Sequence, residues 1–231
     1  RNTTLRMRIG RPFDRKRLLA FENMQDMADY LRMRTCMLGG EPAERARKSL
    51  SVTIARQAPI NNPTSVNLLR RDISALPEEQ HLAESGKLQV WYANADQIPN
   101  LLQEIGRQRE ISFRAVGEGT GKQIDLDIYD RFYLHLFVWD EEYERIVGGY
   151  RLGLVDEILR KYGRRGLYSY SLFRYSHALL QHISPAIELG RSFVRPEYQR
   201  SFAPLMLLWK GIGHFVARHP QYALSLIHIS E

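Results

Sequence analysis

The chain has 231 residues, of which 44% are hydrophobic and 26% charged, so it suffices for one medium domain or two small ones and is not disordered. It contains no run of about 18 apolar residues, so no membrane-spanning helix is predicted, and its N-terminal residues are not typical of a signal peptide. The formal net charge is +7, and the excess lies in residues 1–50, with 12 Lys/Arg against 6 Asp/Glu.

A basic surface of this kind can face nucleic acid, anionic lipid or an acidic carrier protein. No nucleic-acid motif accompanies it, which makes nucleic acid the least favoured of the three. The single cysteine, Cys36, excludes an internal disulfide framework and fits a reducing cytoplasm. It is expected to be a small buried residue.

The N-terminal part of the chain predicts a short strand at 5–9, closed by a turn at Gly10-Arg11-Pro12, and then a helix. The helix is indicated by one apolar face at Met24, Met27, Ala28 and Leu31. From 41 to 86 the periodicity is lost and prolines recur, so this segment is predicted to be a linker. The second domain is expected to span 87–223.

Within that domain strand and helix patterns alternate, which predicts an α/β fold on a central sheet. The helix near 98–105 is expected to be capped by Asn94 or Asp96. A Gly-rich loop at 117–121 follows, and two later strands form an antiparallel hairpin around the acidic turn 140–142. The predicted strands are 87–92, 132–139, 146–154 and 185–194, and the last helix covers 205–216.

The final residues, 224–231 (LSLIHISE), do not fit this pattern. A closing strand is expected here, but the sequence resembles a translated sequencing adapter, so it is expected to be a non-native tail and is left out of the predicted fold together with His228. The chain also lacks an initiator Met, and both ends suggest a fragment.

Three carboxylates lie close together at Asp125, Asp127 and Asp130. In an extended chain, Asp125 and Asp127 would point to one side and Asp130 to the other. Like charges at this separation raise one pKa, which suits a general base or an anchor for a cationic amine. The alternative is a solvated acidic turn without chemistry.

Charged residues also interrupt apolar strands. Glu188 and Arg191 lie in a strand from Ile187 to Val194, where charges are costly unless they are paired or used, so the alternatives are a site and a structural ion pair. Arg151 follows Gly148 and Gly149, which permit close approach of another backbone or a ligand.

Three further groups are weaker candidates. Arg195, Arg200 and Ser201 lie before the last helix, whose N-terminus could bind phosphate. A lone strand histidine such as His135 is usually structural, and Arg107, Arg109 and Arg114 could form one solvated helix face.

Taken together, these segments resemble a GNAT-like family that includes the bacterial ornithine-lipid N-acyltransferases and proteins called hemolysin-like. The resemblance spans about 89–222. It is carried by 109–114 (REISFR), 125–130 (DLDIYD), His135-Leu136, 148–152 (GGYRL) and 188–194 (ELGRSFV). Acyl-homoserine-lactone synthases share a looser version.

This resemblance implies a mixed, largely antiparallel central sheet flanked by helices. It also implies transfer of a fatty or 3-hydroxy fatty acyl group from acyl carrier protein, or from CoA, to the amine of an amino acid such as ornithine. The product would be a lyso-aminolipid, and neither a metal nor a permanently bound cofactor is implied. The enzyme would be cytoplasmic, with peripheral contact to the anionic inner membrane.

By position, the resemblance assigns roles in three sets. Glu188, Asp127 and Asp130 would be catalytic, with Glu188 the preferred base. The acyl-carrier phosphate would meet Arg195, Arg200 and Ser201. The substrate-binding residues would be Arg109, Arg114, Asp125, His135, Arg151 and Arg191.

Residues 5–38 resemble the C-terminal end of a lysophospholipid (glycerol-phosphate-type) acyltransferase domain, through 9–13 (IGRPF) and 30–38 (YLRMRTCML). Residues 1–40 are therefore expected to be a remnant of that domain, with no chemistry of their own. Two rival functions stay open: a signal synthase, and a non-catalytic membrane-associated interaction module. The enzymatic interpretation requires the acidic turn, Arg151 and the Glu188–Arg191 strand to converge on one cleft beside the final helix.

Overall fold

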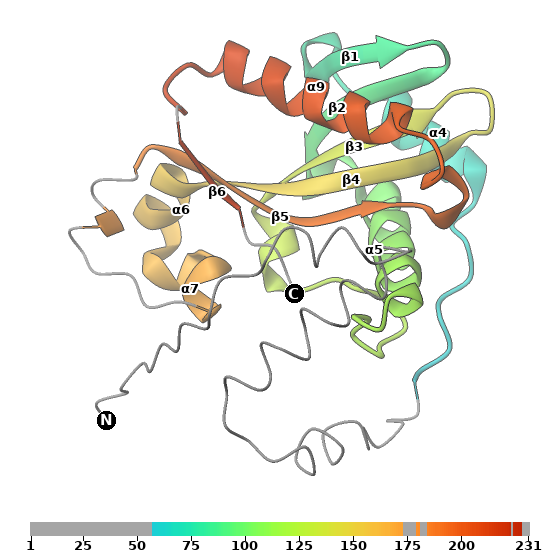
Figure 1. Ribbon diagram of the computed structural model, residues 1–231, viewed down its shortest axis with the longest axis horizontal. Coiled ribbons are helices and arrows are strands. Elements are labelled where there is room, and N and C mark those ends of the chain that lie inside the picture. Colours follow the sequence, from blue (N-terminus) through green and yellow to red (C-terminus); the bar gives the residue numbers. More distant parts are fainter. Residues whose placement is uncertain (1–56, 173–178, 181–183, 223, 228–231) are drawn as a thin grey trace, which may run out of the picture. The chain divides into compact units, whose positions relative to one another are not determined.

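The computed structural model describes residues 57–172, 179–180, 184–222 and 224–227 (Figure 1). The expected strand at 5–9, the helix at 24–31, Cys36, the domain remnant at 1–40 and residues 41–56 of the linker all lie outside these residues. Within the described part of the chain, no helix is both long and apolar enough to cross a membrane.

A six-stranded sheet with the order β1-β2-β3-β4-β5-β6 forms the centre of the fold. Neighbours from β1 to β5 are antiparallel, and β5 and β6 are parallel. The expected mixed, largely antiparallel sheet is thus confirmed. The strands are β1 (His81–Ser85), β2 (Leu88–Asn94), β3 (Leu134–Asp140), β4 (Arg145–Leu154), β5 (Ala186–Val194) and β6 (Leu224–Ile227).

Helices cover both faces of the sheet (Figure 1). Apolar residues alternate along β3, so that Leu136 packs with the residues of α9, and Phe137 packs with those of α5. The helices are α4 (Val66–Ser74), α5 (Pro99–Ala115), α6 (Val155–Tyr162), α7 (Ser169–Leu172) and α9 (Ala203–Arg218). Short 3-10 helices are η1 (Glu78–Gln80), η2 (Ala95–Gln97), η3 (Ile128–Arg131), η4 (Arg164–Gly166) and η5 (Pro196–Tyr198).

Part of the expected linker belongs to the folded domain, which is a correction. Residues Arg56–Glu231 form one compact unit, and both α4 and strand β1 lie in the segment assigned to the linker. The side chain of Asp72 on α4 accepts hydrogen bonds from the backbone N–H of Asn100 (2.7 Å) and Leu101 (2.9 Å) at the start of α5. Asn94, one expected cap of α5, instead forms a capping box with Gln97 around η2.

The last strand pairs with only the first half of β5. The register runs from Ala186 opposite Leu224 to Leu189 opposite Ile227, whereas β5 continues to Val194. Residues 224–227, which were left out of the predicted fold, therefore occupy the place of the closing strand.

Candidate active site

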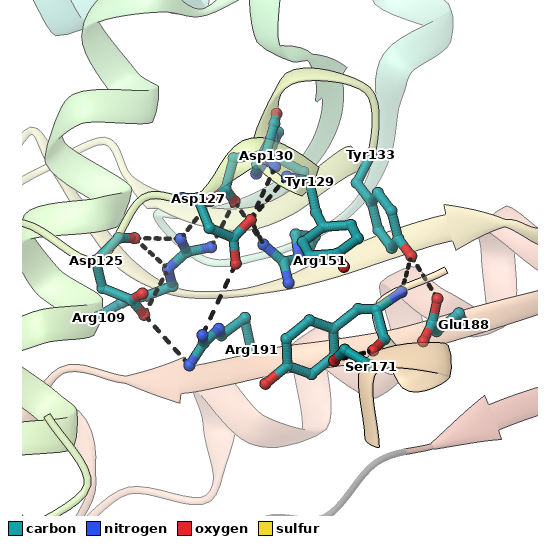
Figure 2. A network of polar contacts seen from close by, with 12 residues as sticks. Arg109, Asp125, Asp127, Tyr129, Asp130, Tyr133, Arg151, Ser171, Glu188 and Arg191 are labelled. Atoms are coloured by element: carbon teal, nitrogen blue, oxygen red, sulfur yellow. Dashed lines mark hydrogen bonds and ion pairs between the residues drawn. The ribbon is translucent and has the colours of Figure 1, made fainter. Parts of the chain in front are cut away.

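Arg109 on α5 ties two of the three aspartates together (Figure 2). Its Nη1 donates to Asp130 Oδ1 (2.9 Å), its Nη2 donates to Asp130 Oδ2 (2.9 Å), and its Nε lies 3.3 Å from Asp125 Oδ2. Arg109, Asp125 and Asp130 are each at most 2% exposed. Arg109 and Asp130 therefore form a buried bidentate ion pair, which fixes the acidic turn to α5.

Arg151 on β4 holds the same turn from the sheet side. Its Nη1 donates to Asp127 Oδ1 (2.7 Å) and lies 3.2 Å from Asp130 Oδ1. The guanidinium also lies over three aromatic rings, at 5.2–5.6 Å from the centroids of Tyr129, Tyr133 and Tyr168. Cation–π contacts of this kind stabilise a buried cation.

The three carboxylates do not alternate in direction as an extended chain would require. Asp127 is the N-cap of η3, where Oδ1 accepts from the backbone N–H of Tyr129 (2.8 Å), and Asp130 Oδ2 accepts from Asp127 N–H (2.7 Å). This turn brings Asp130 to the same arginines as Asp125 and Asp127. The expectation that Asp130 faces away is wrong, because the backbone turns after Asp127.

The environment separates the pKa values of two of these carboxyls. Burial raises the pKa of Asp125, against the opposing charges of Arg109 and Arg191. Burial acts in the same sense on Asp130, but the charges of Arg109 and Arg151 outweigh it and hold the pKa of Asp130 well below its usual range. Asp130 is thus a permanently ionised anchor, whereas Asp125 is the more readily protonated of the two.

Arg191 is the least tightly held of the three arginines. It occupies a left-handed conformation (φ 50°) in β5, beside a register irregularity between Gly149 and Arg151 of β4. Its Nη1 lies 3.8 Å from Asp125 Oδ2, its Nη2 lies 3.8 Å from Asp127 Oδ2, and its buried Nε has no hydrogen-bond partner among the described residues. The strained backbone therefore presents a cation that retains unused donors.

Glu188 forms a separate buried network with the segment around α7. It is 2% exposed, Tyr133 Oη donates to its Oε2, and Ser169 N–H donates to its Oε1 (2.5 Å). Tyr133 Oη also accepts from Tyr168 N–H (2.9 Å), and burial with the charge of Glu188 raises the pKa of Tyr133. Because both its oxygens accept internal hydrogen bonds, Glu188 is placed to position α7 rather than to reach a substrate.

Two further expected binding residues also have internal partners. His135 Nε2 lies 2.8 Å from the carbonyl oxygen of Asp130, and burial lowers the pKa of His135 to about 4, so the ring is neutral at pH 7. Arg114 Nε donates to Glu110 Oε1 (2.7 Å), and Glu110 in turn accepts from the N–H groups of Thr120 and Gly121. These contacts hold the turn and the Gly-rich loop.

The residues expected to bind phosphate lie at the start of α9. Arg195 Nη2 pairs with Glu197 Oε1 (3.1 Å), and Ser201 Oγ accepts weakly from Ala203 N–H (3.3 Å). Arg200 and Ser201 are exposed. A helix N-terminus with two exposed polar side chains stays available for a phosphate.

A cavity of about 800 Å³ runs between α5, β5 and α9. The cavity is lined mainly by apolar residues, and its polar lining consists of Ser112, Glu118, Tyr168, Arg191, Ser192 and Gln199. The lining includes Phe113, Val116, Tyr150, Leu189, Gly190, Phe193, Val194, Leu205, Leu208 and Trp209. The lining contains the part of β5 that lies beyond its pairing with β6.

The expected convergence on one cleft is found only in part, because of its charged residues only Arg191 lines the cavity, and Glu188 is buried against Tyr133 and Ser169. The acidic turn, Arg151 and Arg191 form one cluster, and Arg191 connects it to the cavity. Most members are sealed inside the protein, whereas the side chains of Asp127 (25% exposed) and Arg191 (23% exposed) are partly exposed. The expected site did not include the aromatic residues Phe113, Tyr129, Tyr133 and Tyr168, although Phe113 and Tyr129 lie within the motifs 109–114 and 125–130. Among the described residues, no group of three or more His, Cys, Asp or Glu side chains could hold a metal ion.

One known protein family matches the part of the chain that contains these residues. Residues 108–210, from α5 to the middle of α9, match the acetyltransferase (GNAT) domain. The match covers less than half of the chain, and over these residues the chain is similar to a GNAT domain.

Three relatives are similar to a larger part of the chain. The chain is 38% identical over 171 residues to a glycine N(alpha)-acyltransferase of Phocaeicola vulgatus, covering 68% of this chain and 52% of that protein. It is 38% identical over 167 residues to a glycine N(alpha)-acyltransferase of Bacteroides thetaiotaomicron, covering 67% and 49%. It is 32% identical over 155 residues to an L-ornithine N(alpha)-acyltransferase of Brucella abortus, covering 60% and 51%. The chain spans about half the length of each of these relatives.

Proposed function

We propose that this protein is an N-acyltransferase that moves a fatty acyl group from acyl carrier protein to the α-amine of an amino acid, giving an N-acyl amino acid or lyso-aminolipid. Support comes from the similarity to a GNAT domain and from relatives named for the acylation of glycine and L-ornithine. The observation that carries the proposal is the position of Arg191, a cation on the cavity wall next to a partly exposed carboxylate.

Arg191 and Asp127 suit the two charged ends of a free amino acid. The guanidinium of Arg191 would bind the acceptor carboxylate with donors that its 3.8 Å contacts leave unused. Asp127 Oδ2 would receive the ammonium group. Arg151 and Arg109 would hold Asp127 and Asp130 in place, so that the acceptor enters a preformed site.

The acyl donor would occupy the apolar part of the cavity. Residues 190–194 of β5 extend past the end of β6, and such a strand edge can pair with the amide groups of a pantetheine arm. The start of α9, with Arg200 and Ser201, would meet the phosphate. No glycine occurs in 198–204, a segment that would need close backbone approach to hold a CoA pyrophosphate, and this favours acyl carrier protein as donor.

Chemically, the acceptor ammonium first loses a proton, with Asp127 accepting it directly or through water. The neutral amine then attacks the thioester carbonyl carbon, a C–N bond forms and the C–S bond breaks. The nitrogen loses a second proton as the amide forms, the pantetheine thiolate takes up one proton, and the third proton stays on the amide nitrogen. No acyl-enzyme is required, since no nucleophile with a partner base lies among the cavity residues of the described chain.

The test is to incubate the purified protein with acyl carrier protein charged with a fatty or 3-hydroxy fatty acid, or with acyl-CoA, and a panel of acceptors. The panel pairs glycine and ornithine with glycinamide and ornithinamide, which lack the carboxylate. We expect an N-acyl amino acid by mass spectrometry, formed faster from the acid of each pair. Equal use of the amides would contradict the role of Arg191, and no product from any amine would contradict the function.

A further inference from the structure

Helix α9 and its N-cap carry four large apolar side chains on the solvent side. Their spacing of i, i+3, i+4 and i+7 places them in one row along the first two turns. The opposite side of α9 packs on the sheet through Leu207, Leu208 and Phe215. The row, called the α9 stripe below, consists of Phe202 (82% exposed), Leu205 (42%), Met206 (64%) and Trp209 (47%). One helix therefore has two apolar sides, and among the residues that the structure describes nothing covers the second.

The α9 stripe is continuous with the mouth of the cavity. Leu205 and Trp209 belong to the stripe and also line the cavity, and Val116 of α5, 67% exposed, lines it from the other side. A molecule that leaves the cavity past these residues meets an apolar surface before it meets water.

The charged side chains of α9 and of the residues directly before it have one sign, although Glu118 lines the same cavity and Glu197 pairs with Arg195. From Tyr198 to Tyr222 the sequence contains no Asp or Glu, whereas it contains Arg200, Lys210 and Arg218. Arg200 and Lys210 are exposed and flank the stripe at its two ends. A surface with a large apolar area and a few cations at its border is complementary to an anionic lipid surface.

We propose that the α9 stripe inserts into the interface of an anionic lipid bilayer. Trp209 and Phe202 are residue types that favour the headgroup level, and Arg200 and Lys210 would contact lipid phosphates. A docking site for an acidic carrier protein would be richer in charge, whereas apolar area dominates here. In one respect the inference rests on the proposed function: a single-chain acylated product would pass from the cavity directly into the bilayer.

Intrinsic fluorescence tests this contact without any substrate. The chain has three tryptophans, and Trp91 (8% exposed) and Trp139 (3% exposed) are buried, so a change on adding vesicles reports Trp209. With vesicles of phosphatidylglycerol and phosphatidylcholine we expect a blue shift, and quenching by brominated acyl chains. Trp209→Phe should abolish the signal but keep most of the sedimentation with vesicles. Sedimentation of the parent chain without a change in Trp209 emission would mean binding through another surface, such as the basic residues 1–50, and would overturn the proposal.

Variants locate the surface. Phe202→Ser/Met206→Ser should lower vesicle binding by about tenfold or more, and Arg200→Glu/Lys210→Glu should reduce the preference for anionic vesicles to a similar extent. The control is Tyr162→Ser/Leu172→Ser, which removes two exposed apolar side chains (50% and 46%) from α6 and α7 on the other face of the sheet, and it should bind like the parent.

Two results would overturn the inference. The first is that the Phe202→Ser/Met206→Ser variant binds vesicles as well as the parent does. The second is that this variant loses only its binding to acyl carrier protein, which would assign the stripe to the carrier. Because the vesicle assay contains no acyl donor or acceptor, its failure leaves the proposed acyl transfer intact. Normal vesicle binding without acyl transfer would count against the proposed function alone.

Discussion

Arg151 Nη1 lies 2.7 Å from Asp127 Oδ1, so the second strand of the central hairpin holds the one carboxylate of the acidic turn that is partly exposed. The same guanidinium is 2% exposed and enclosed by tyrosine rings. The orientation of Asp127 is therefore set by buried neighbours before any ligand binds. Such preorganisation lowers the entropic cost of reaching the reactive geometry.

Arg191→Met should raise the KM for the amino acid acceptor by about tenfold or more, because it removes a charge-assisted contact worth roughly 1.5–3 kcal/mol. The KM for the acyl donor should change little. Steady-state kinetics with each substrate varied in turn measures this. The amide acceptors provide the control, since parent and variant should use them alike; a variant that loses acid and amide equally would show a general structural role.

Asp127→Asn and Glu188→Gln distinguish the roles of two of the three carboxylates that were expected to be catalytic. We expect Asp127→Asn to lower kcat by about 100-fold through loss of a proton acceptor. Glu188→Gln weakens a buried hydrogen-bond network instead, so its main effect should be a lower melting temperature, with kcat within about tenfold of the parent. A large loss of kcat at unchanged melting temperature in Glu188→Gln would restore Glu188 as the base.

Arg109→Met should destabilise the fold by about 3–5 kcal/mol, because it leaves Asp125 and Asp130 buried without their main counter-charge. Urea unfolding at pH 7 measures the change. The control is Lys161→Met, which breaks an exposed pair with Glu157 (55% and 43% exposed) and should cost less than about 1 kcal/mol. Equal costs for the two variants would contradict the structural role of Arg109.

His135 should make the protein less stable as the pH falls from 7 to 5. Burial lowers the pKa of His135 to about 4, below the unfolded value of about 6.5, so the unfolded chain takes up a proton in this window while the folded chain does not. The parent should lose about 2 kcal/mol more than His135→Asn between pH 7 and pH 5, by urea unfolding at each pH.

Patterning predicted the hairpin and the two longest helices well, because their apolar periodicity reflects a sheet with two covered faces. The predicted strands 132–139 and 146–154 correspond to β3 and β4. The expectation for the glycines is also confirmed: a Cβ on Gly148 would lie 2.6 Å from the carbonyl oxygen of Phe193, so the backbone of β5 occupies that space.

Other features could not be predicted from local sequence. α4 and β1 lie among prolines that suggested a linker, and both pack against helices that are distant in sequence, α4 against α5 and β1 against α9. Nor does any pattern distinguish the sealed Glu188 from the accessible Arg191, three residues later on the same strand. The left-handed residue at 191 decides that difference, and it arises from the pairing with β4.

The contact of Asp72 with the first turn of α5 bears on how the domain is produced in isolation. An expression boundary at Lys87, where the sequence pattern suggests that the domain begins, would delete this carboxylate and leave the N–H groups of Asn100 and Leu101 uncapped. It would also strip β1 from β2 and expose a hydrogen-bonding edge that favours self-association. Shortened versions intended for crystallisation should therefore start ahead of Val66.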